Sequence, residues 1–580
     1  MNNVNKNGNV VNINNRMWLT ESKESAHLQH IEFWSPFLRL NEQVKDSNSR
    51  SNRMHDSIYA QAKERAAEGM EVSEYARLVP DRIAVQSPLG QLSYAELNAQ
   101  ANSVAHFLRA QGVNEGDKVA LLCSNRAEFV VVRFATYRIG AVLTPVNWHL
   151  TRDEIAYIVD NCDAKVLFAD MRVTESAEWA ASHCSKLKAQ VAIGGAIEGF
   201  LDWPALLASY SIEDITQPSL GGMMLYTSGT TGRPKGVERK QPDAKLVVDM
   251  MAATINAFQF DPESGSDLAL TSGPLYHTGP FNLTMTFPII AGIGTVLMDK
   301  WEPELTLQLI QQHRITHCFF VPTMFHRLLQ LPQVVREKYD TSSLKFVLHS
   351  AAPCPVDTKQ KMMDWWGPVI WEMMATTEGP GTLVSPQEWL AKPGTVGKPQ
   401  PGQVKVVDEA GRETPAGEAG TLYWINPPNS RFQYYKDADK TTANTRDGYF
   451  TAGDVGYLDE DGYLFLTGRS AEVIIAGGVN IYPQEIDDLI LQHSAVEDVA
   501  CVGIPNSEWG EEIKAVVVLA PKHSQSDATA NDILQFARLH LAKQKWPRSI
   551  DFVTALPRTE TGKVLRRQIR NRYWTTDSKI

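Results

Sequence analysis

The stretch LYTSGTTGRPKGVERK, residues 225–240, decides how the rest of the chain is interpreted. It begins in an apolar run, residues 223–226, that is typical of a strand, and continues with hydroxyl side chains, glycines and cations. Glycines let backbone N–H groups approach an anion closely, hydroxyls add donors, and a lysine supplies a point charge for a polyphosphate. The residues expected to form this phosphate cradle are Thr227, Ser228, Gly229, Thr230, Thr231, Gly232 and Lys235.

The cradle differs from the P-loop of the NTPases, because Pro234 precedes Lys235 and Gly236 follows it. A polar surface turn is the alternative interpretation, but a turn needs only one or two residues of this kind. The stretch resembles the phosphate-binding loop of the adenylate-forming superfamily, which includes acyl-CoA synthetases, firefly luciferase and the adenylation domains of peptide synthetases. The resemblance extends from about position 75 to the C-terminus.

Composition sets the outer limits of the prediction. A chain of 580 residues, 43% of them hydrophobic, is large enough for several domains. Its net charge of -11 argues against nucleic acid as the main partner. The six cysteines lack C-x-x-C spacing, so neither disulfides nor a zinc site is expected and the cytoplasm is the expected location. No apolar run is long enough for a membrane span.

The pattern of apolar runs predicts an α/β fold. Strand-like runs at 118–122, 142–146 and 165–169 alternate with helical patterns at 127–139 and from about 152. This alternation favours a mostly parallel sheet covered by helices, whose ligands bind at the carboxyl ends of the strands. With the resemblance, we expect a leader at 1–70, partly disordered, an N-terminal AMP-binding domain of mixed, mostly parallel sheets at 71–468, and a small mobile α+β C-terminal domain at 469–580.

A second motif, WEMMATTEG at 371–379, resembles the threonine–glutamate motif of the superfamily. The resemblance implies that Thr377 contacts the α-phosphate and that Glu378 coordinates Mg²⁺, which needs only one or two protein carboxylates. Met374 stands where the commoner version of the motif has an aromatic residue, so a polarizable thioether would face the adenine. A buried threonine beside a surface glutamate is the alternative interpretation.

Several shorter segments match the nucleotide and acyl sites of the superfamily. The resemblance implies that the small residues Ser350, Ala351, Ala352 and Pro353 line the adenine, that Asp454 accepts hydrogen bonds from the ribose hydroxyls, and that Arg469 adds a ribose or phosphate contact. His277, in PLYHTGP, would border the carboxylate end of the acyl pocket as a positioning residue. A loop histidine without a special role is the alternative.

The C-terminal part carries residues that the resemblance assigns to CoA. The pivot of the mobile domain would lie near Ala471, and Gly477 and Gly478 would line the path of the pantetheine arm, where side-chain-free positions are needed. Trp509 would pack against CoA, although an interface aromatic would look the same. A basic cluster at Lys543, Lys545, Arg548, Arg566 and Arg567 is consistent with recruiting the nucleotide end of CoA.

Lys563 lies in LPRTETGKVLRR at 556–567. It resembles a lysine of the superfamily that enters the active site of the larger domain while the acyl-AMP is formed. An anionic carboxylate must attack an anionic α-phosphate, and an ammonium between them stabilises the developing charge. The resemblance therefore predicts an ATP-dependent acyl-CoA ligase with ATP, Mg²⁺ and CoA as its cofactor and co-substrates. The alternatives are transfer to a carrier-protein thiol, another acyl-AMP reaction, or a non-catalytic nucleotide-binding protein.

The carboxylic acid itself is predicted only as a class. The amino-acid sequences of the motifs resemble those of ligases for fatty acids and for steroid side chains. The apolar segment 281–285 suggests a sizeable apolar pocket. A homodimer is the expected assembly.

Overall fold

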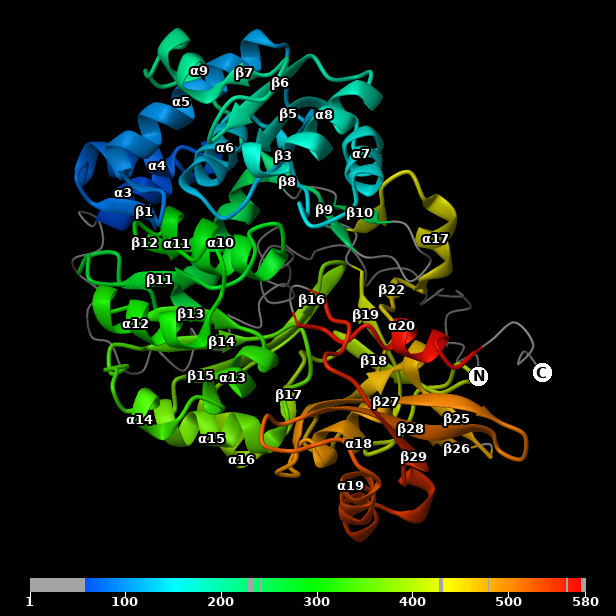
Figure 1. Cartoon of the computed structure of the whole chain (residues 1–580). Coiled ribbons are helices and arrows are strands. Elements are labelled where there is room, and N and C mark those ends of the chain that lie inside the picture. Colours follow the sequence, from blue (N-terminus) through cyan, green and yellow to red (C-terminus); the bar gives the residue numbers. More distant parts are fainter. Residues whose placement is uncertain are drawn as a thin grey trace, which may run out of the picture.

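The computed structural model describes residues 58–227, 234–239, 243–426, 431–477, 479–559 and 562–574. Figure 1 shows a large N-terminal part, blue to yellow, and a smaller C-terminal sheet with its helices, orange to red. Residues 1–57, 228–233 and 478 lie outside the described residues, so the expected disorder of the leader stays a prediction.

The first layer of the N-terminal part is a six-stranded parallel sheet with the order β7-β6-β5-β3-β4-β8. Its strands are β3 (Lys118–Leu122), β4 (Val142–Pro145), β5 (Ala164–Asp170), β6 (Ala189–Ile193), β7 (Leu201–Asp202) and β8 (Gly222–Met223). The helices between them are α6 (Ala127–Tyr137), α7 (Arg152–Asn161), α8 (Thr174–His183) and α9 (Trp203–Ser209). Thr151 begins α7 with a capping box to Glu154, which satisfies two of the free N–H groups at the helix start.

The second layer is an eight-stranded sheet with the order β16-β15-β14-β13-β11-β12-β1-β2, mixed but parallel at its centre. Its strands are β1 (Ile83–Ser87), β2 (Gly90–Ser93), β11 (Leu268–Thr271), β12 (Gly294–Leu297), β13 (His317–Phe320), β14 (Phe346–His349), β15 (Ile370–Thr376) and β16 (Gly379–Val384). The associated helices are α3 (Ile58–Glu64), α4 (Glu71–Leu78), α5 (Tyr94–Ala110), α10 (Ala244–Ala257), α11 (Phe287–Ile290), α12 (Pro303–His313), α13 (Pro322–Leu329), α14 (Gln333–Arg336), α15 (Val356–Trp366) and α16 (Pro386–Ala391).

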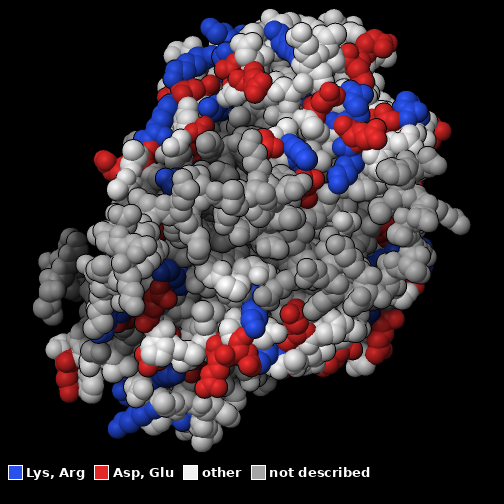
Figure 2. All heavy atoms as spheres, turned by 180° about the vertical axis from the view of Figure 1, so that it is seen from behind, with Lys and Arg blue, Asp and Glu red and all other residues white. Residues whose placement is uncertain are grey.

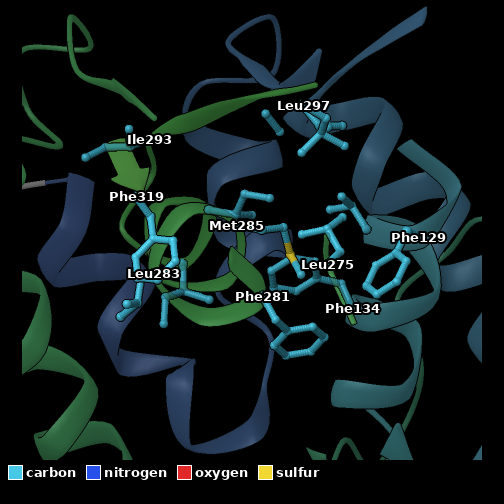
Figure 3. Close-up of a cluster of buried hydrophobic side chains, with 14 of the residues drawn as sticks. Phe129, Phe134, Leu275, Phe281, Leu283, Met285, Ile293, Leu297 and Phe319 are labelled. Carbon is cyan, nitrogen blue, oxygen red and sulfur yellow. The ribbon is translucent and has the colours of Figure 1, made fainter. Parts of the chain in front are cut away.

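One continuous apolar core joins these two sheets. It includes side chains from α4, α5 and α6 as well as from β11 to β15. Figure 3 shows part of it, where Phe129 and Phe134 of α6 face Phe281 and Met285 of the segment η3 (Pro280–Thr286). Burial of aromatic side chains of this size contributes about 2 kcal/mol each, so the two sheets are held as one body.

Two smaller antiparallel sheets complete the N-terminal part. The three-stranded sheet β20-β10-β9 combines β9 (Leu225–Thr227), β10 (Lys235–Arg239) and β20 (Phe432–Tyr434). The other contains β17 (Thr395–Gly397), β18 (Val404–Val407), β19 (Gly420–Ile425), β21 (Thr445–Arg446), β22 (Tyr449–Phe450), β23 (Asp454–Leu458) and β24 (Leu464–Arg469). Helix α17 (Ala438–Ala443) connects β20 to β21.

The C-terminal sheet has the order β26-β25-β28-β27 with β29 paired to β28. Its strands are β25 (Ile474–Ala476), β26 (Val479–Ile481), β27 (Val496–Asn506), β28 (Gly510–Leu519) and β29 (Ser549–Phe552), with the helices α18 (Pro483–Ile490), α19 (Asp527–His540) and α20 (Arg566–Asn571). A separate apolar core lies under this sheet. The short 3₁₀ turn η4 (Ser470–Glu472) links the C-terminal sheet to β24.

The α/β fold class is confirmed, and the predicted strands and helices are present with shifts of a few residues at their ends. Two details add to the prediction. Within the segment expected to be the leader, Ala62 and Met70 are fully buried in the main core, and the domain boundaries stay a prediction. The strand at the start of the phosphate stretch is β9, which belongs to an antiparallel sheet. Strand β8 of the parallel sheet ends at Met223, two residues before β9 begins. No helix within the described residues is long and apolar enough to cross a membrane.

Acidic and basic side chains are interspersed on the face shown in Figure 2, as far as the described residues form it. A broad surface of one sign is absent from that part of the face.

Candidate active site

A cavity of about 990 Å³ lies between the N-terminal part and the C-terminal sheet. It is lined by the ends of β9 and β10, by the loops after β14 and β15, by β20, α17 and β23, and by the turn before α20. Most of the predicted site residues in the described part of the chain line it: Thr227, Lys235, His277, Ser350, Ala351, Ala352, Pro353, Met374, Thr377, Glu378, Asp454, Arg469 and Lys563.

Lys235 lines the end of the cavity where the phosphates are predicted to bind. It begins β10 directly opposite Thr227, the last residue of β9. The predicted cradle residues Ser228, Gly229, Thr230, Thr231 and Gly232 connect these two positions and lie outside the described residues. The Lys235 side chain is largely buried and its ammonium lies 3.8 Å from the Asp437 carboxylate. Burial, together with the neighbouring Lys440, lowers the pKa of Lys235 to about 8.

The threonine–glutamate motif lies at the end of β15 and in the turn that follows it. Tyr434 of β20 donates a hydrogen bond of 3.1 Å to the Glu378 carboxylate, and Arg239 of β10 donates one of 2.7 Å to the carbonyl oxygen of Thr377. These contacts fix the motif against the three-stranded sheet. The buried hydroxyl of Thr376 has no hydrogen-bond partner among the described residues, so a polar atom of a ligand would satisfy it.

Mg²⁺ fits this arrangement. A carboxylate has about four lone-pair sites, and the Tyr434 hydroxyl uses one of those of Glu378. A Mg²⁺ ion that accompanies a polyphosphate takes one or two protein carboxylates, with phosphate oxygens and waters as its other ligands. Glu378 would be the protein ligand.

The predicted adenine segment leaves β14 at Ser350 and turns sharply. Ala351 has a φ angle of +75°, in the left-handed region that costs a residue other than glycine about 1–3 kcal/mol. Beneath the segment, Glu372 of β15 lines the cavity. Its carboxylate pairs with the buried Lys359 at 2.7 Å and lies 3.3 Å from a His349 ring nitrogen. These two partners outweigh the effect of burial and lower the pKa of Glu372 to about 2.

Asp454 and Arg469 are direct cross-strand neighbours on β23 and β24. The Arg469 guanidinium lies 3.2 Å from the Asp454 carboxylate. Lys563 lies in the same charged group, since both residues affect its titration. Burial is the largest cause and the positive charge of Arg469 the second, and together they lower the pKa of Lys563 to about 8.

The turn that carries Lys563 is held by Arg558. The Arg558 guanidinium binds both carboxylate oxygens of Asp498, with Nε at 3.0 Å, and also contacts the carbonyl oxygen of Gly562. Thr559 accepts a hydrogen bond of 3.1 Å from the backbone N–H of Lys563. These contacts hold the described residues on either side of the turn, and Lys563 lines the cavity.

The structure corrects one prediction at the end of the cavity where the acid is predicted to bind. The segment η3 is π-helical, and it directs Phe281 and Met285, both fully buried, into the main core and not into the cavity (Figure 3). Asn282 and Leu283 of this segment line the cavity instead, beside His277. A π-helical segment shifts which side chains share a face, and such segments are frequent at functional sites.

The residues predicted to contact CoA are divided, because Gly477 and Trp509 do not line this cavity whereas Arg566 of the basic cluster does. Gly477 packs against the Trp509 ring, which is half exposed, and neither residue lines the cavity. Gly478 lies outside the described residues. The basic cluster is also smaller than predicted. Arg566 is buried and paired with Asp487 and Glu472, and Lys545 is paired with Glu485.

Sequence reasoning missed several residues of the site. Arg239 and Tyr434 hold the threonine–glutamate motif, Glu372 lines the cavity and Lys440 lies beside Lys235. The sequence contains a weak signal for only one of them. Arg239 belongs to the stretch 225–240 and, on an alternating strand, lies four residues after Lys235.

The structure combines a large N-terminal part with a small C-terminal unit, and residues of both, Lys563 among them, line one cavity. Residues 72–434 match the family described as AMP-binding enzyme, and residues 485–563 match the AMP-binding enzyme C-terminal domain. The chain belongs to this family, the adenylate-forming superfamily, and is an ATP-dependent acid–thiol ligase.

Individual relatives cover nearly the whole chain. An indoleacetate–CoA ligase of Aromatoleum aromaticum is 31% identical over 512 residues, which are 86% of this chain and 98% of the relative. A fatty acid–[acyl-carrier-protein] ligase, ScoC, of Streptomyces coeruleorubidus is 31% identical over 511 residues, 87% of this chain and 95% of the relative. The crystal structure of ATP-bound MatB from Rhodopseudomonas palustris has a TM-score of 0.74 and 29% identity, and the match covers 88% of this chain and 99% of MatB.

Proposed function

We propose that the protein activates an apolar carboxylic acid, such as a fatty acid or a steroid side-chain acid, as an acyl-AMP and transfers the acyl group to CoA. The single observation that carries this proposal is the position of Lys563, which enters the cavity that also contains Glu378 and Asp454. A cation from the C-terminal unit is thus available where a carboxylate and an α-phosphate would meet. Both reactants are anions, and a positioned ammonium is expected to lower the barrier between them by about 3 kcal/mol.

The first step forms the mixed anhydride. A carboxylate oxygen of the acid attacks the α-phosphorus of ATP, the bond to the bridging oxygen breaks, and pyrophosphate leaves. The chain's contributions are Thr377 at the α-phosphate, Lys235 at the outgoing phosphates, Asp454 at the ribose hydroxyls and Lys563 between the reacting groups. In this arrangement, His277 positions the carboxylate end of the acid. Mg²⁺, held by Glu378, would neutralise phosphate charge.

The second step transfers the acyl group. The CoA thiol loses its proton and attacks the acyl carbon, the bond to the phosphate oxygen breaks, and AMP leaves. Because Gly477 and Trp509 lie away from the cavity, this step requires the C-terminal unit to change its orientation about the turn that contains Ala471. Gly477 and Gly478 would then line the path of the pantetheine arm and Trp509 would pack against CoA.

The nature of the acid is supported by the cavity wall. Leu283, Phe287 and Phe319 supply apolar surface, whereas Asn282 and Thr254 add polar atoms on the same side. Relatives in this family are named for indoleacetate and for fatty acids, which supports an apolar acid of either the aromatic or the aliphatic kind. We therefore infer an apolar acid whose chain or ring system lies along η3.

A panel of acids tests the proposal. Pyrophosphate release should be measured with ATP and Mg²⁺ for indoleacetate, a cinnamate, fatty acids of several lengths and a steroid side-chain acid. We expect release to depend on an apolar acid and a CoA ester to form only when CoA is added. Pyrophosphate release without any CoA ester would contradict the choice of CoA as acceptor.

Transfer to a carrier-protein thiol is the second candidate. It is favoured by the relative named as an acyl-carrier-protein ligase and by the burial of Arg566, which removes one cation from the predicted CoA-recruiting cluster. Mass spectrometry of a holo carrier protein offered in competition with CoA distinguishes the two acceptors.

A homodimer stays a prediction, which light scattering of the purified protein tests.

A further inference from the structure

Lys440 lies at the phosphate end of the cavity although no sequence motif indicates it. It belongs to α17, which follows β20. Strand β20 pairs antiparallel with β10, with Tyr434 opposite Val237. The carboxyl end of β20 therefore lies beside the amino end of β10, where Lys235 and the phosphate stretch are found. The fold thus brings two lysines that are 205 positions apart to the same end of one small sheet.

Asp437 fixes Lys440 in this place. Its carboxylate caps α17 by accepting a hydrogen bond of 3.1 Å from the backbone N–H of Lys440. The same carboxylate lies 3.8 Å from the Lys235 ammonium. Thr441 accepts a hydrogen bond of 2.9 Å from the backbone N–H of Tyr434, which ties α17 to β20. The position of Lys440 is therefore set by the fold and does not depend on a flexible loop.

The two ammonium groups are close enough to interact, and both line the cavity. Lys235 is about nine-tenths buried, with 11% of its side chain exposed. Asp437 is the ion-pair partner of Lys235, whereas Lys440 has no ion-pair partner among the described residues. Two adjacent like charges, only one of which has a carboxylate as its ion-pair partner, repel each other in the absence of a ligand. An anion with several charges would convert this repulsion into attraction.

We propose that Lys440 is a second cation of the phosphate site, which binds the β- and γ-phosphates of ATP and the departing pyrophosphate together with Lys235. Only the part of this inference that concerns pyrophosphate as a leaving group rests on the proposed function. Binding of the phosphates can be measured without any acid. Tyr434, whose ring lies 5.6 Å below the Lys235 ammonium, separates this cation pair from Glu378. The cations and the Mg²⁺ ligand thus contact different parts of the triphosphate.

The test compares ligands that share the nucleoside but differ in phosphates. Affinities of Mg-ATP, Mg-pyrophosphate and AMP should be measured by calorimetry for the wild type, Lys440→Gln and Lys440→Arg. We expect Lys440→Gln to weaken the affinity for Mg-ATP and Mg-pyrophosphate by about tenfold or more, because a hydrogen bond to a charged group is lost. The affinity for AMP should stay unchanged, since AMP lacks the β- and γ-phosphates. Lys440→Arg keeps the charge and should bind all three ligands as the wild type does.

Lys436→Gln is the matched control. Lys436 carries the same charge on the same segment, but it pairs with Asp163 at 2.8 Å and does not line the cavity. Equal losses for Lys436→Gln and Lys440→Gln would overturn the proposal, since the effect would then be one of net charge. An equal loss of AMP and ATP affinity in Lys440→Gln would also overturn it, because the defect would be structural. A wild type that binds Mg-ATP but forms no acyl-AMP would contradict the proposed function and leave this comparison intact.

Discussion

Gly562 and Thr323 are in such close contact that a Cβ atom on Gly562 would lie 2.2 Å from the Thr323 hydroxyl oxygen. Thr323 belongs to the first turn of α13 in the N-terminal part, and Gly562 precedes Lys563 in the C-terminal unit. A second link lies nearby, where a His326 ring nitrogen hydrogen bonds with the carbonyl oxygen of Glu497 at 2.9 Å. The turn that carries Lys563 is therefore seated directly on α13.

Gly562→Ala should separate the two half-reactions. The new methyl group would clash with Thr323, and alanine at φ +76° adds strain of about 1–2 kcal/mol. We expect slower acyl-AMP formation from ATP and acid, while synthetic acyl-AMP is still converted with CoA, because the second step uses another orientation. Single-turnover assays of each step measure this. Gly199→Ala, at a positive φ with open space around it, is the control and should affect neither step.

Arg558→Gln should impair Lys563 without changing the binding of ATP. The guanidinium connects Asp498 to the carbonyl oxygen of Gly562, so its loss leaves the turn without its main support. We expect a lower kcat for pyrophosphate release with an unchanged KM for ATP, and partial recovery in Arg558→Lys. Arg412→Gln, which breaks an exposed pair with Asp408, should have no effect. A rise in the KM for ATP alone would show that Arg558 acts on the nucleotide and not on the turn.

The pH dependence of adenylation should reveal the lowered pKa of Lys563. An unperturbed lysine keeps its proton until about pH 10, but the pKa of Lys563 is lowered to about 8 by burial and by Arg469. Only the protonated form offsets the charge of the reactants, so kcat/KM for acyl-AMP formation should fall as the pH rises through about 8. Lys235 titrates in the same range, and Lys235→Arg removes its contribution. A profile that stays flat up to pH 10 would be inconsistent with a buried Lys563.

The buried ion pair Lys359–Glu372 should contribute strongly to the free energy of unfolding. Lys359→Met leaves a buried carboxylate without its main partner, which typically costs about 3–5 kcal/mol. Denaturant unfolding measures the loss, and the double variant with Glu372→Leu should recover a large part of it. Lys361→Met, which removes an exposed pair with Asp357 on the same helix, should cost less than about 1 kcal/mol. Equal losses for the two lysines would contradict the burial of Lys359.

Local patterns were sufficient to predict the α/β fold class, and the resemblance to the adenylate-forming superfamily supplied most of the residues that gather at the cavity. Alternating apolar runs identified β3, β4, β5 and the helices between them, because propensity and burial agree along these segments. The glycine- and hydroxyl-rich stretch and the Thr377–Glu378 pair were recognisable because their chemistry is concentrated in a few adjacent residues.

The residues that sequence reasoning missed depend on contacts between distant segments. Lys440 reaches the phosphate end only because β20 pairs with β10. Arg566 looked like a surface cation, but Asp487 and Glu472 enclose it. Phe281 and Met285 looked like pocket residues, but the π-helical turn of η3 directs them into the core. None of these arrangements has a local signal in the sequence.

The central claim is that Lys563 acts in the first half-reaction, and Lys563→Ala tests it most directly. The measurement is the single-turnover rate of acyl-AMP formation, with conversion of synthetic acyl-AMP by CoA as the control reaction. We predict a loss of about a hundredfold or more in the first rate, as expected for removal of one positioned charge at a developing anion, and little change in the second. Formation of acyl-AMP at the wild-type rate would contradict the account.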